Sequence, residues 1–127
     1  MSSLPLGERA LTVSDLEALL GDDPPTLTLD PVAAERVRAS RAVVDQAMAD
    51  DRTCYGINTG FGKLSSVRIE AEDLRALQVN LVRSHAAGMG DPLPWAVCRL
   101  ALALRAANLS RGHSGVRQEL VEHVLAV

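Results

Sequence analysis

Residues 94–109 have the sequence PWAVCRLALALRAANL. Alanine and leucine, the commonest residues in this stretch, have the highest helix propensities. On a helix the apolar side chains of the stretch cover most sides: Val97, Leu100, Ala101, Leu102, Ala103, Leu104, Ala106 and Ala107. A helix that is apolar nearly all round is normally buried in a large body or at an oligomer interface. The stretch therefore predicts a buried helix and, with it, a mainly α fold.

Further helices are predicted on both sides of this segment. Asp30 followed by Pro31 is a typical helix start, because aspartate caps free amides and proline needs no amide partner in the first turn. Apolar residues at helical spacing then predict helices over residues 31–49 and 71–87. A last helix is expected to begin at a Ser114 cap and to continue to the end of the chain.

A small two-strand β ribbon is predicted near the N-terminus. Residues 26–29, TLTL, alternate polar and apolar side chains, as a half-buried strand does. Residues 9–13 are the expected partner strand. Ser14 and Glu17, three residues apart, fit a capping box for a short helix between the two strands, which is expected to stop at Gly21.

Composition and charge exclude several classes of protein. The chain has 127 residues, a formal net charge of −3 and scattered arginines, which disfavours nucleic-acid binding. Cys54 and Cys98 form no CxxC pair, so no metal site is predicted, and we expect reduced thiols in a cytoplasmic protein. The N-terminus lacks the pattern of a signal peptide. No apolar run approaches the ~20 residues of a membrane span, so no membrane partner is expected.

Residues 55–62, YGINTGFG, hold three of the nine glycines and two of the three aromatic residues. Glycine disfavours helix and allows a backbone to lie close to a ligand, so this stretch predicts a loop. Tyr55 carries the only phenol of the chain; it is either an ordinary loop tyrosine or a group that faces a cavity. The Gly62-Lys63 pair is no phosphate-binding loop, because the Walker A pattern fails at Ile57 and Leu64.

Two other polar side chains, those of His85 and Arg111, are candidates for a structural or a functional role. His85, near the end of its predicted helix, is either a half-buried histidine favoured by the helix dipole or a hydrogen-bond partner for a polar ligand. Arg111, in the stretch NLSRGHSG, is interpreted as a structural ion-pair donor.

The last helix stops at Val127 in mid-pattern without a cap, which leads us to expect the N-terminal piece of a longer protein.

Three separated segments together resemble one family: YGINTGFGKL, LVRSHAAGMGDPLP and ANLSRGHSGVRQEL. They are similar to the N-terminal region of the aromatic amino acid ammonia-lyases, most of all to the histidine-specific branch. The resemblance covers about residues 10–127. It implies a large, mostly α-helical homotetramer, in which residues 1–127 form the N-terminal part of a single larger domain and residues 55–67 form an active-site loop.

The resemblance also implies a cofactor that this chain does not encode. The family's electrophile is 4-methylidene-imidazol-5-one (MIO), formed autocatalytically from an Ala-Ser-Gly tripeptide that follows the matched region. No Ala-Ser-Gly occurs in the 127 residues. The chain alone is therefore expected to be inactive and to bind no cofactor of its own.

Site residues follow from the resemblance position by position. Tyr55 matches the tyrosine that acts in removal of the substrate β-proton. His85 matches the position that contacts the substrate side chain, and the preceding Ser84 favours the histidine-specific branch. Gly62 matches a glycine whose backbone lies next to the bound ligand. Departures occur at Lys63 and His113, where apolar or aromatic residues are more usual.

The resemblance implies that the full-length protein converts L-histidine to trans-urocanate and ammonia, the first step of histidine degradation. Alternatives from the same family are a tyrosine or phenylalanine ammonia-lyase and an MIO-dependent aminomutase. A non-catalytic alternative is a helical module that dimerises through the apolar segment 94–109.

Overall fold

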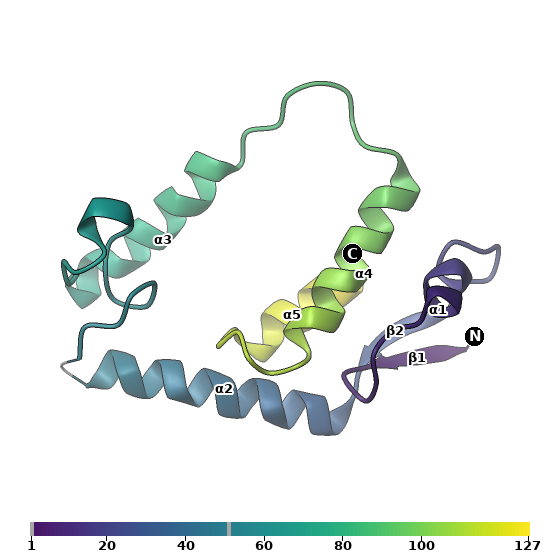
Figure 1. Cartoon of the computed structure of the whole chain (residues 1–127), viewed down its shortest axis with the longest axis horizontal. Helices are drawn as coiled ribbons and strands as arrows, with labels where there is room; N and C mark the ends of the chain where they lie inside the picture. The colour runs from purple at the N-terminus through teal and green to yellow at the C-terminus, as the bar shows by residue number, and fades with distance from the viewer. Residues whose placement is uncertain (1, 51) are drawn as a thin grey trace. The chain divides into compact units, whose positions relative to one another are not determined.

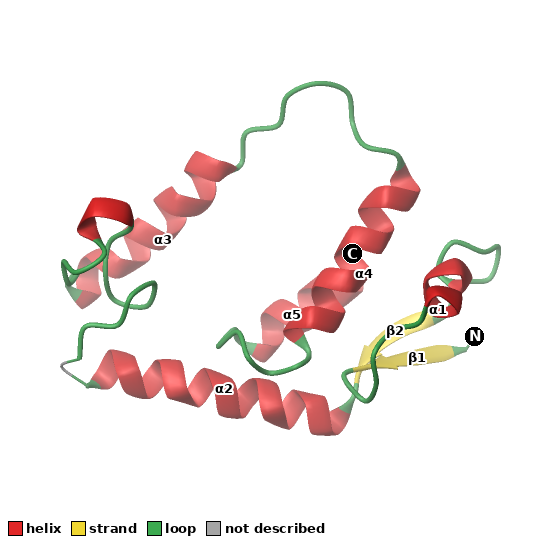
Figure 2. Cartoon of the chain, viewed as in Figure 1, coloured by secondary structure: helices red, strands yellow, loops and turns green. Residues whose placement is uncertain are grey.

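The computed structural model describes residues 2–50 and 52–127, and this part of the chain is mainly helical (Figure 2). Figure 1 shows the elements in chain order. They are β1 (Ser3–Leu6), α1 (Val13–Ala18), β2 (Thr26–Leu29), α2 (Pro31–Ala49), the 3-10 turn η1 (Gly62–Leu64), α3 (Ala71–His85), α4 (Trp95–Leu109) and α5 (Gln118–Ala126). The predicted mainly α fold with a two-strand ribbon is confirmed.

The described residues divide into two compact units. The first unit contains Met1–Val43 and Pro92–Val127, and the second contains Val44–Asp91. The strands, α1, α4 and α5 belong to the first unit. The second unit holds the glycine-rich loop, η1 and α3.

The ribbon of the first unit is parallel, with Ser3 opposite Thr26 and Leu6 opposite Leu29 (Figure 1). In β2 the two leucines are partly buried and the two threonines are exposed, which is the period-two pattern that predicted this strand. The predicted partner at residues 9–13 was wrong, because β1 lies further towards the N-terminus. Gly7, at φ +98°, follows β1 in a conformation that is incompatible with a continuing strand.

Helix α1 begins two residues earlier than its sequence signature suggested. The capping box is formed by Thr12 and Asp15, and the predicted pair Ser14 and Glu17 was wrong. The amide of Asp15 donates to Thr12 Oγ1 (3.2 Å), and the amide of Thr12 donates to Asp15 Oδ2 (2.7 Å). Arg9 donates two hydrogen bonds to the same carboxylate, at 2.6 and 2.8 Å. This forked pair selects Asp15 as the capping acid.

The Asp15 carboxylate should make α1 sensitive to acid. The hydrogen bond from Arg9, followed by those from Thr12, holds the pKa of Asp15 well below its usual range. A lowered pKa adds stability above the unfolded-state value of about 3.9 and loses it as the pH falls. Arg9→Gln should therefore lower the unfolding free energy at neutral pH, with a deficit that shrinks below about pH 4. Urea unfolding across this range measures the effect.

Arg105→Gln is the matched control, because Arg105 is an exposed arginine of the same unit without an ion pair among the described residues. This variant should show no such pH-dependent deficit. An Arg9→Gln deficit that stays constant down to acid pH would contradict the role assigned to the Arg9–Asp15 pair.

Helix α2 begins and ends where the sequence predicted. Asp30 Oδ1 accepts hydrogen bonds from the amides of Val32 (2.9 Å) and Ala33 (3.0 Å), so the predicted cap is confirmed. The helix buries Ala33 together with Ala34 and Val37. The first turns of α2 thereby supply one wall of the core of the first unit.

The core of the first unit joins α2, α4 and α5. Val37, Leu109 and Val121 form its buried centre. Partly buried residues pack around it: Leu29, Val116 and Leu125. In α4 the buried residues are Ala103, Ala106 and Leu109, while Trp95, Val97, Leu102 and Leu104 are exposed. Within this chain, therefore, α4 buries one face and not its whole circumference.

Two predicted helix ends needed correction. Helix α3 ends at His85, two residues earlier than predicted. Helix α5 begins at Gln118 and not at the predicted Ser114 cap. Gly115 explains the second difference, because its φ of +64° lies outside the helical range and its amide donates to Ser40 Oγ (3.0 Å) in α2.

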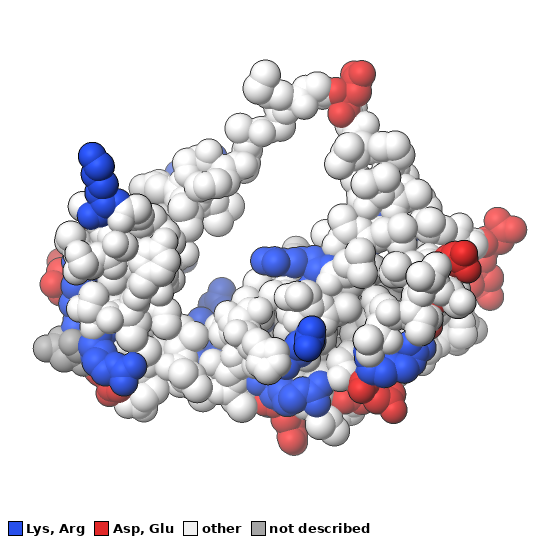
Figure 3. Space-filling view, in the orientation of Figure 1, with Lys and Arg blue, Asp and Glu red and all other residues white. Residues whose placement is uncertain are grey.

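Charge, helix hydropathy and possible metal ligands are further features of the described residues. On the face shown in Figure 3, acidic groups lie among the lysines and arginines, and no continuous basic surface is visible. None of the helices in residues 2–50 and 52–127 has the length and hydropathy needed to cross a bilayer. The same residues contain no group of three His, Cys, Asp or Glu side chains that could hold a metal ion. Both cysteines are free thiols.

Candidate functional site

The glycine-rich segment forms a loop closed by backbone hydrogen bonds. The amide of Gly60 donates to the Val67 carbonyl (3.1 Å), and the amide of Ile69 donates to the Asn58 carbonyl (2.9 Å). An isolated antiparallel bridge pairs Thr59 with Arg68 between these bonds. The turn η1 lies between the paired segments. The loop is therefore a defined structure held at its base.

Two buried polar side chains hold the first half of the loop. Asn58 is only 4% exposed; its Oδ1 accepts from the Cys54 amide (2.7 Å) and its Nδ2 donates to the Arg52 carbonyl (2.8 Å). Thr59 is 1% exposed; its hydroxyl donates to the Gly60 carbonyl (2.9 Å) and accepts from the Gly56 amide (3.3 Å). No role was predicted from the sequence for these short polar residues. The signal was present, because Asn and Thr between glycines commonly bond their own backbone.

Asn58→Ala should destabilise the second unit by about 1–3 kcal/mol, because the Cys54 amide and the Arg52 carbonyl each lose a partner in a buried position. Amide hydrogen exchange at Cys54 and Ile69, together with urea unfolding, measures the loss. Asn80→Ala is the matched control, since Asn80 is exposed on α3. Equal protection of the two amides in both variants would contradict the role given to Asn58.

Tyr55 lies at the surface of this loop. Its side chain is 66% exposed, and its ring contacts Phe61 edge-on, with 6.2 Å between centroids and 72° between planes. Among the described residues no group bonds to its hydroxyl. The Tyr55 ring is therefore positioned by its contact with Phe61 and by the hydrogen-bonded loop backbone. Its hydroxyl is accessible to a ligand.

Two glycines of the loop have open space around their backbone. Gly56 and Gly62 have φ of +76° and +58°, and a Cβ built on either would meet no atom within 4 Å. Gly60 differs, because its added Cβ would lie 2.6 Å from Leu64 Cβ. Gly60 therefore serves the packing of the loop itself. Gly62, the predicted ligand neighbour, presents bare backbone to open space.

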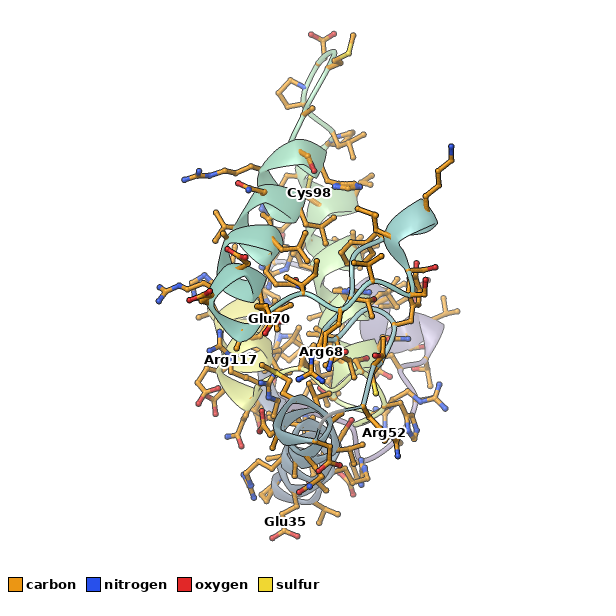
Figure 4. The ribbon with its side chains drawn as sticks, turned by 90° about the vertical axis from the view of Figure 1, so that its left-hand side faces the viewer. Glu35, Arg52, Arg68, Glu70, Cys98 and Arg117 are labelled. Carbon is orange, nitrogen blue, oxygen red and sulfur yellow. The ribbon has the colours of Figure 1, made fainter. Side chains whose placement is uncertain are left out.

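All charged side chains of the loop are basic. Residues 52–69 contain three basic side chains, Arg52, Lys63 and Arg68, and no acidic one. In Figure 4 Arg52 and Arg68 lie on the segments that enter and leave the loop, and Glu70 follows at the start of α3. A surface with an excess of positive charge favours an anionic ligand group such as a carboxylate.

His85 is the last residue of α3 and is exposed, so the half-buried interpretation was wrong. Its Nδ1 lies 2.8 Å from the Leu81 carbonyl oxygen and 3.1 Å from Ser84 Oγ. The Ser84 hydroxyl donates to the same carbonyl at 2.8 Å. His85 and Tyr55 belong to the same compact unit, and both side chains reach solvent.

The third segment of the predicted signature, residues 108–115, lies in the other unit. Arg111 is exposed and forms no ion pair with any described residue, so its interpretation as an ion-pair donor was wrong. Gly112 has the structural role in this segment: it has a φ of +75° and lies directly against the backbone of Arg36. His113 lines an open cavity of about 550 Å³ together with Arg36 and Arg111. None of Tyr55, Gly62 and His85 lines that cavity.

The comparison with known families decides the relationship. The family profile described as aromatic amino acid lyase matches residues 11–127. The chain belongs to the aromatic amino acid lyase family. The match includes all three segments that carried the resemblance, and it extends over the second unit and all but the first ten residues of the first unit.

Individual relatives within the aromatic amino acid lyases point to one branch. Histidine ammonia-lyase of Bacillus subtilis (strain 168) is 50% identical over 117 residues, which are 92% of this chain and 23% of that protein. Histidine ammonia-lyase of Pseudomonas fluorescens (strain SBW25) is 47% identical with the same coverage. The chain thus spans about a quarter of the length of these curated relatives.

Solved structures agree with the family assignment. The crystal structure of histidine ammonia-lyase from Trypanosoma cruzi superposes with a TM-score of 0.83 at 41% identity, covering 95% of this chain and 23% of that one. The crystal structure of tyrosine aminomutase from Streptomyces globisporus reaches a TM-score of 0.86 at 26% identity, covering 98% and 23%. The lyase fold is therefore shared with enzymes of more than one named activity.

Proposed function

We propose that this chain is the N-terminal part of a histidine ammonia-lyase, whose complete form converts L-histidine to trans-urocanate and ammonia. The observation that carries the proposal is 50% identity to a histidine ammonia-lyase across both compact units. The exposed phenol of Tyr55, the open backbone at Gly62 and the exposed imidazole of His85 support it. The complete protein would act as a homotetramer in the cytoplasm.

The residues present fit the neighbourhood of the family's MIO group. The loop offers a phenol oxygen without a partner among the described residues, and it contains two glycines with open space around them. The open space at Gly56 and Gly62 leaves room for a group from another part of the protein. MIO supplies an electrophile that activates the amino acid substrate. It would be formed from an Ala-Ser-Gly that the 127 residues do not contain, so we expect this chain alone to be inactive.

The chain's own residues would perform three tasks. The Tyr55 oxygen, as phenolate, takes the β-proton, which is too weakly acidic to be lost without prior activation of the substrate. The bare backbone at Gly62 lets the ligand approach closely, and His85 contacts the imidazole side chain of the substrate.

Two measurements test the proposal. One is the coding sequence that contains these 127 codons, and the other is the reaction product of the protein it encodes. The coding sequence should contain an Ala-Ser-Gly, and the purified protein should release ammonia and form urocanate, which absorbs in the near ultraviolet. A continuous reading frame without that tripeptide would refute the lyase assignment.

The similarity to tyrosine aminomutase supports a second candidate, an MIO-dependent aminomutase. Such an enzyme would use the same loop and return the amino group to the β-carbon. Its product is a β-amino acid without the near-ultraviolet absorption of urocanate, and no ammonia is released. The assay therefore distinguishes the two. The lower identity, 26% against 41% for the solved histidine ammonia-lyase, favours the lyase.

A further inference from the structure

The last turn of α3 constrains the imidazole of His85 through one ring nitrogen. Nδ1 lies 2.8 Å from the carbonyl oxygen of Leu81, one turn earlier in the helix. A backbone carbonyl can only accept a hydrogen bond. A contact this short is favourable only when Nδ1 carries a hydrogen, because two unprotonated acceptors would repel each other. The neutral ring must then be the Nδ1–H tautomer.

The hydrogen bonds of Ser84 indicate the same Nδ1–H tautomer of His85. Its hydroxyl donates to the Leu81 carbonyl at 2.8 Å, which uses its only hydrogen. The oxygen of Ser84 therefore meets Nδ1, 3.1 Å away, with a lone pair. It too can only accept there, so Nδ1–H is shared between two acceptors. A donor role for Ser84 towards Nδ1 would leave the imidazole and the Leu81 carbonyl opposed as two acceptors.

We propose that Ser84 is a positioning residue that, with the Leu81 carbonyl, holds His85 in the Nδ1–H tautomer, so that Nε2 is presented as a hydrogen-bond acceptor. The hydrogen bond at one ring nitrogen decides which nitrogen is protonated, and with it the role of the other. This inference rests on the proposed function for its ligand: an N–H donor, which in L-histidine is the N–H of the substrate's imidazole ring.

Ser84 is suited to this task by its size and place. A serine in the last turn of a helix can bond a carbonyl three residues earlier without leaving the helix. Threonine offers the same hydroxyl and would preserve the arrangement. Alanine keeps the helix but removes one of the two acceptors, so the ring could turn and the other tautomer would gain population.

Nitrogen NMR of the imidazole tests the tautomer without any turnover. The chain has three histidines, and His113→Gln and His123→Gln assign the signals. In mildly alkaline buffer, long-range proton–nitrogen spectra should show Nδ1 protonated and Nε2 unprotonated at His85. Ser84→Ala should raise the Nε2–H population, and Ser84→Thr should restore the wild-type pattern. A wild-type Nε2–H ring, or populations unchanged in Ser84→Ala, would overturn the proposal.

Kinetics of the complete protein test the acceptor role towards the ligand. Ser84→Ala should raise KM for L-histidine about 3- to 10-fold, the effect of weakening one neutral hydrogen bond, while kcat stays within about twofold. Ser84→Thr should restore KM. An unchanged KM in Ser84→Ala would overturn the ligand part of the inference. A wild-type protein without histidine turnover would refute the proposed function, while the NMR result would still decide the tautomer.

Discussion

Tyr55→Phe should lower turnover of L-histidine by about 10²- to 10⁴-fold in the complete protein, the range expected when a positioned acid–base group is removed. Phenylalanine keeps the ring and its edge contact with Phe61 and lacks only the oxygen. That oxygen has no partner among the described residues, and the side chain is 66% exposed. The loss should therefore fall on chemistry and not on folding. Urocanate absorbance measures turnover.

Two controls separate chemistry from structure in this experiment. The unfolding free energy of Tyr55→Phe should stay within about 0.5 kcal/mol of the wild type, as for other surface substitutions. Ser66→Ala changes another exposed hydroxyl of the same loop and should leave turnover unchanged. A Tyr55→Phe protein with wild-type turnover would remove Tyr55 from the mechanism, whatever its stability.

Gly112→Ala is expected to lower the unfolding free energy of the first unit by about 3 kcal/mol or more. Two costs add: alanine at a φ of +75° is strained, and overpacking an interior contact typically costs about 1–3 kcal/mol. The added Cβ would lie 2.7 Å from Arg36 Cβ and 2.8 Å from the Arg36 carbonyl carbon and oxygen. These atoms belong to the body of α2 and cannot turn away as a flexible side-chain end can. Urea unfolding measures the loss.

Gly90→Ala isolates the contact from the backbone strain. Gly90 also has a positive φ, +84°, but a Cβ there would meet no atom within 4 Å. Its replacement should cost only the conformational strain, about 1–2 kcal/mol. Equal losses in the two variants would show that the approach of residue 112 to α2 does not limit stability.

The helices could be predicted from sequence because their determinants are local. Asp30 and Pro31 mark the start of α2 within a few residues, and the alanine- and leucine-rich segment 94–109 matches α4 to one residue. The ribbon was predicted only in part. The strand at residues 26–29 alternates visibly, whereas the four residues of β1 become a strand through pairing with β2, which lies more than twenty residues away.

The candidate site, too, could be predicted only in part from the sequence. Tyr55, Gly62 and His85 are site residues predicted from the sequence, because they belong to segments that resemble a family, and they stay predictions. The bracing of the loop by Asn58 was not predicted, because its value depends on burial and on partners at two other backbone positions. The expected ion pair of Arg111 failed for a similar reason: a charged residue type does not reveal whether an opposite charge lies within reach.

By itself the sequence determined the helical character, most helix ends and the family, since periodicity, capping residues and motif spacing act over a few neighbouring residues. Only the tertiary structure decided that β1 pairs in parallel with β2 and that Gly112 must stay small against α2. Each of these depends on distances between groups that the chain brings together only on folding. Hydrogen bonds between the two strands and van der Waals contacts between Gly112 and Arg36 form only in the folded chain.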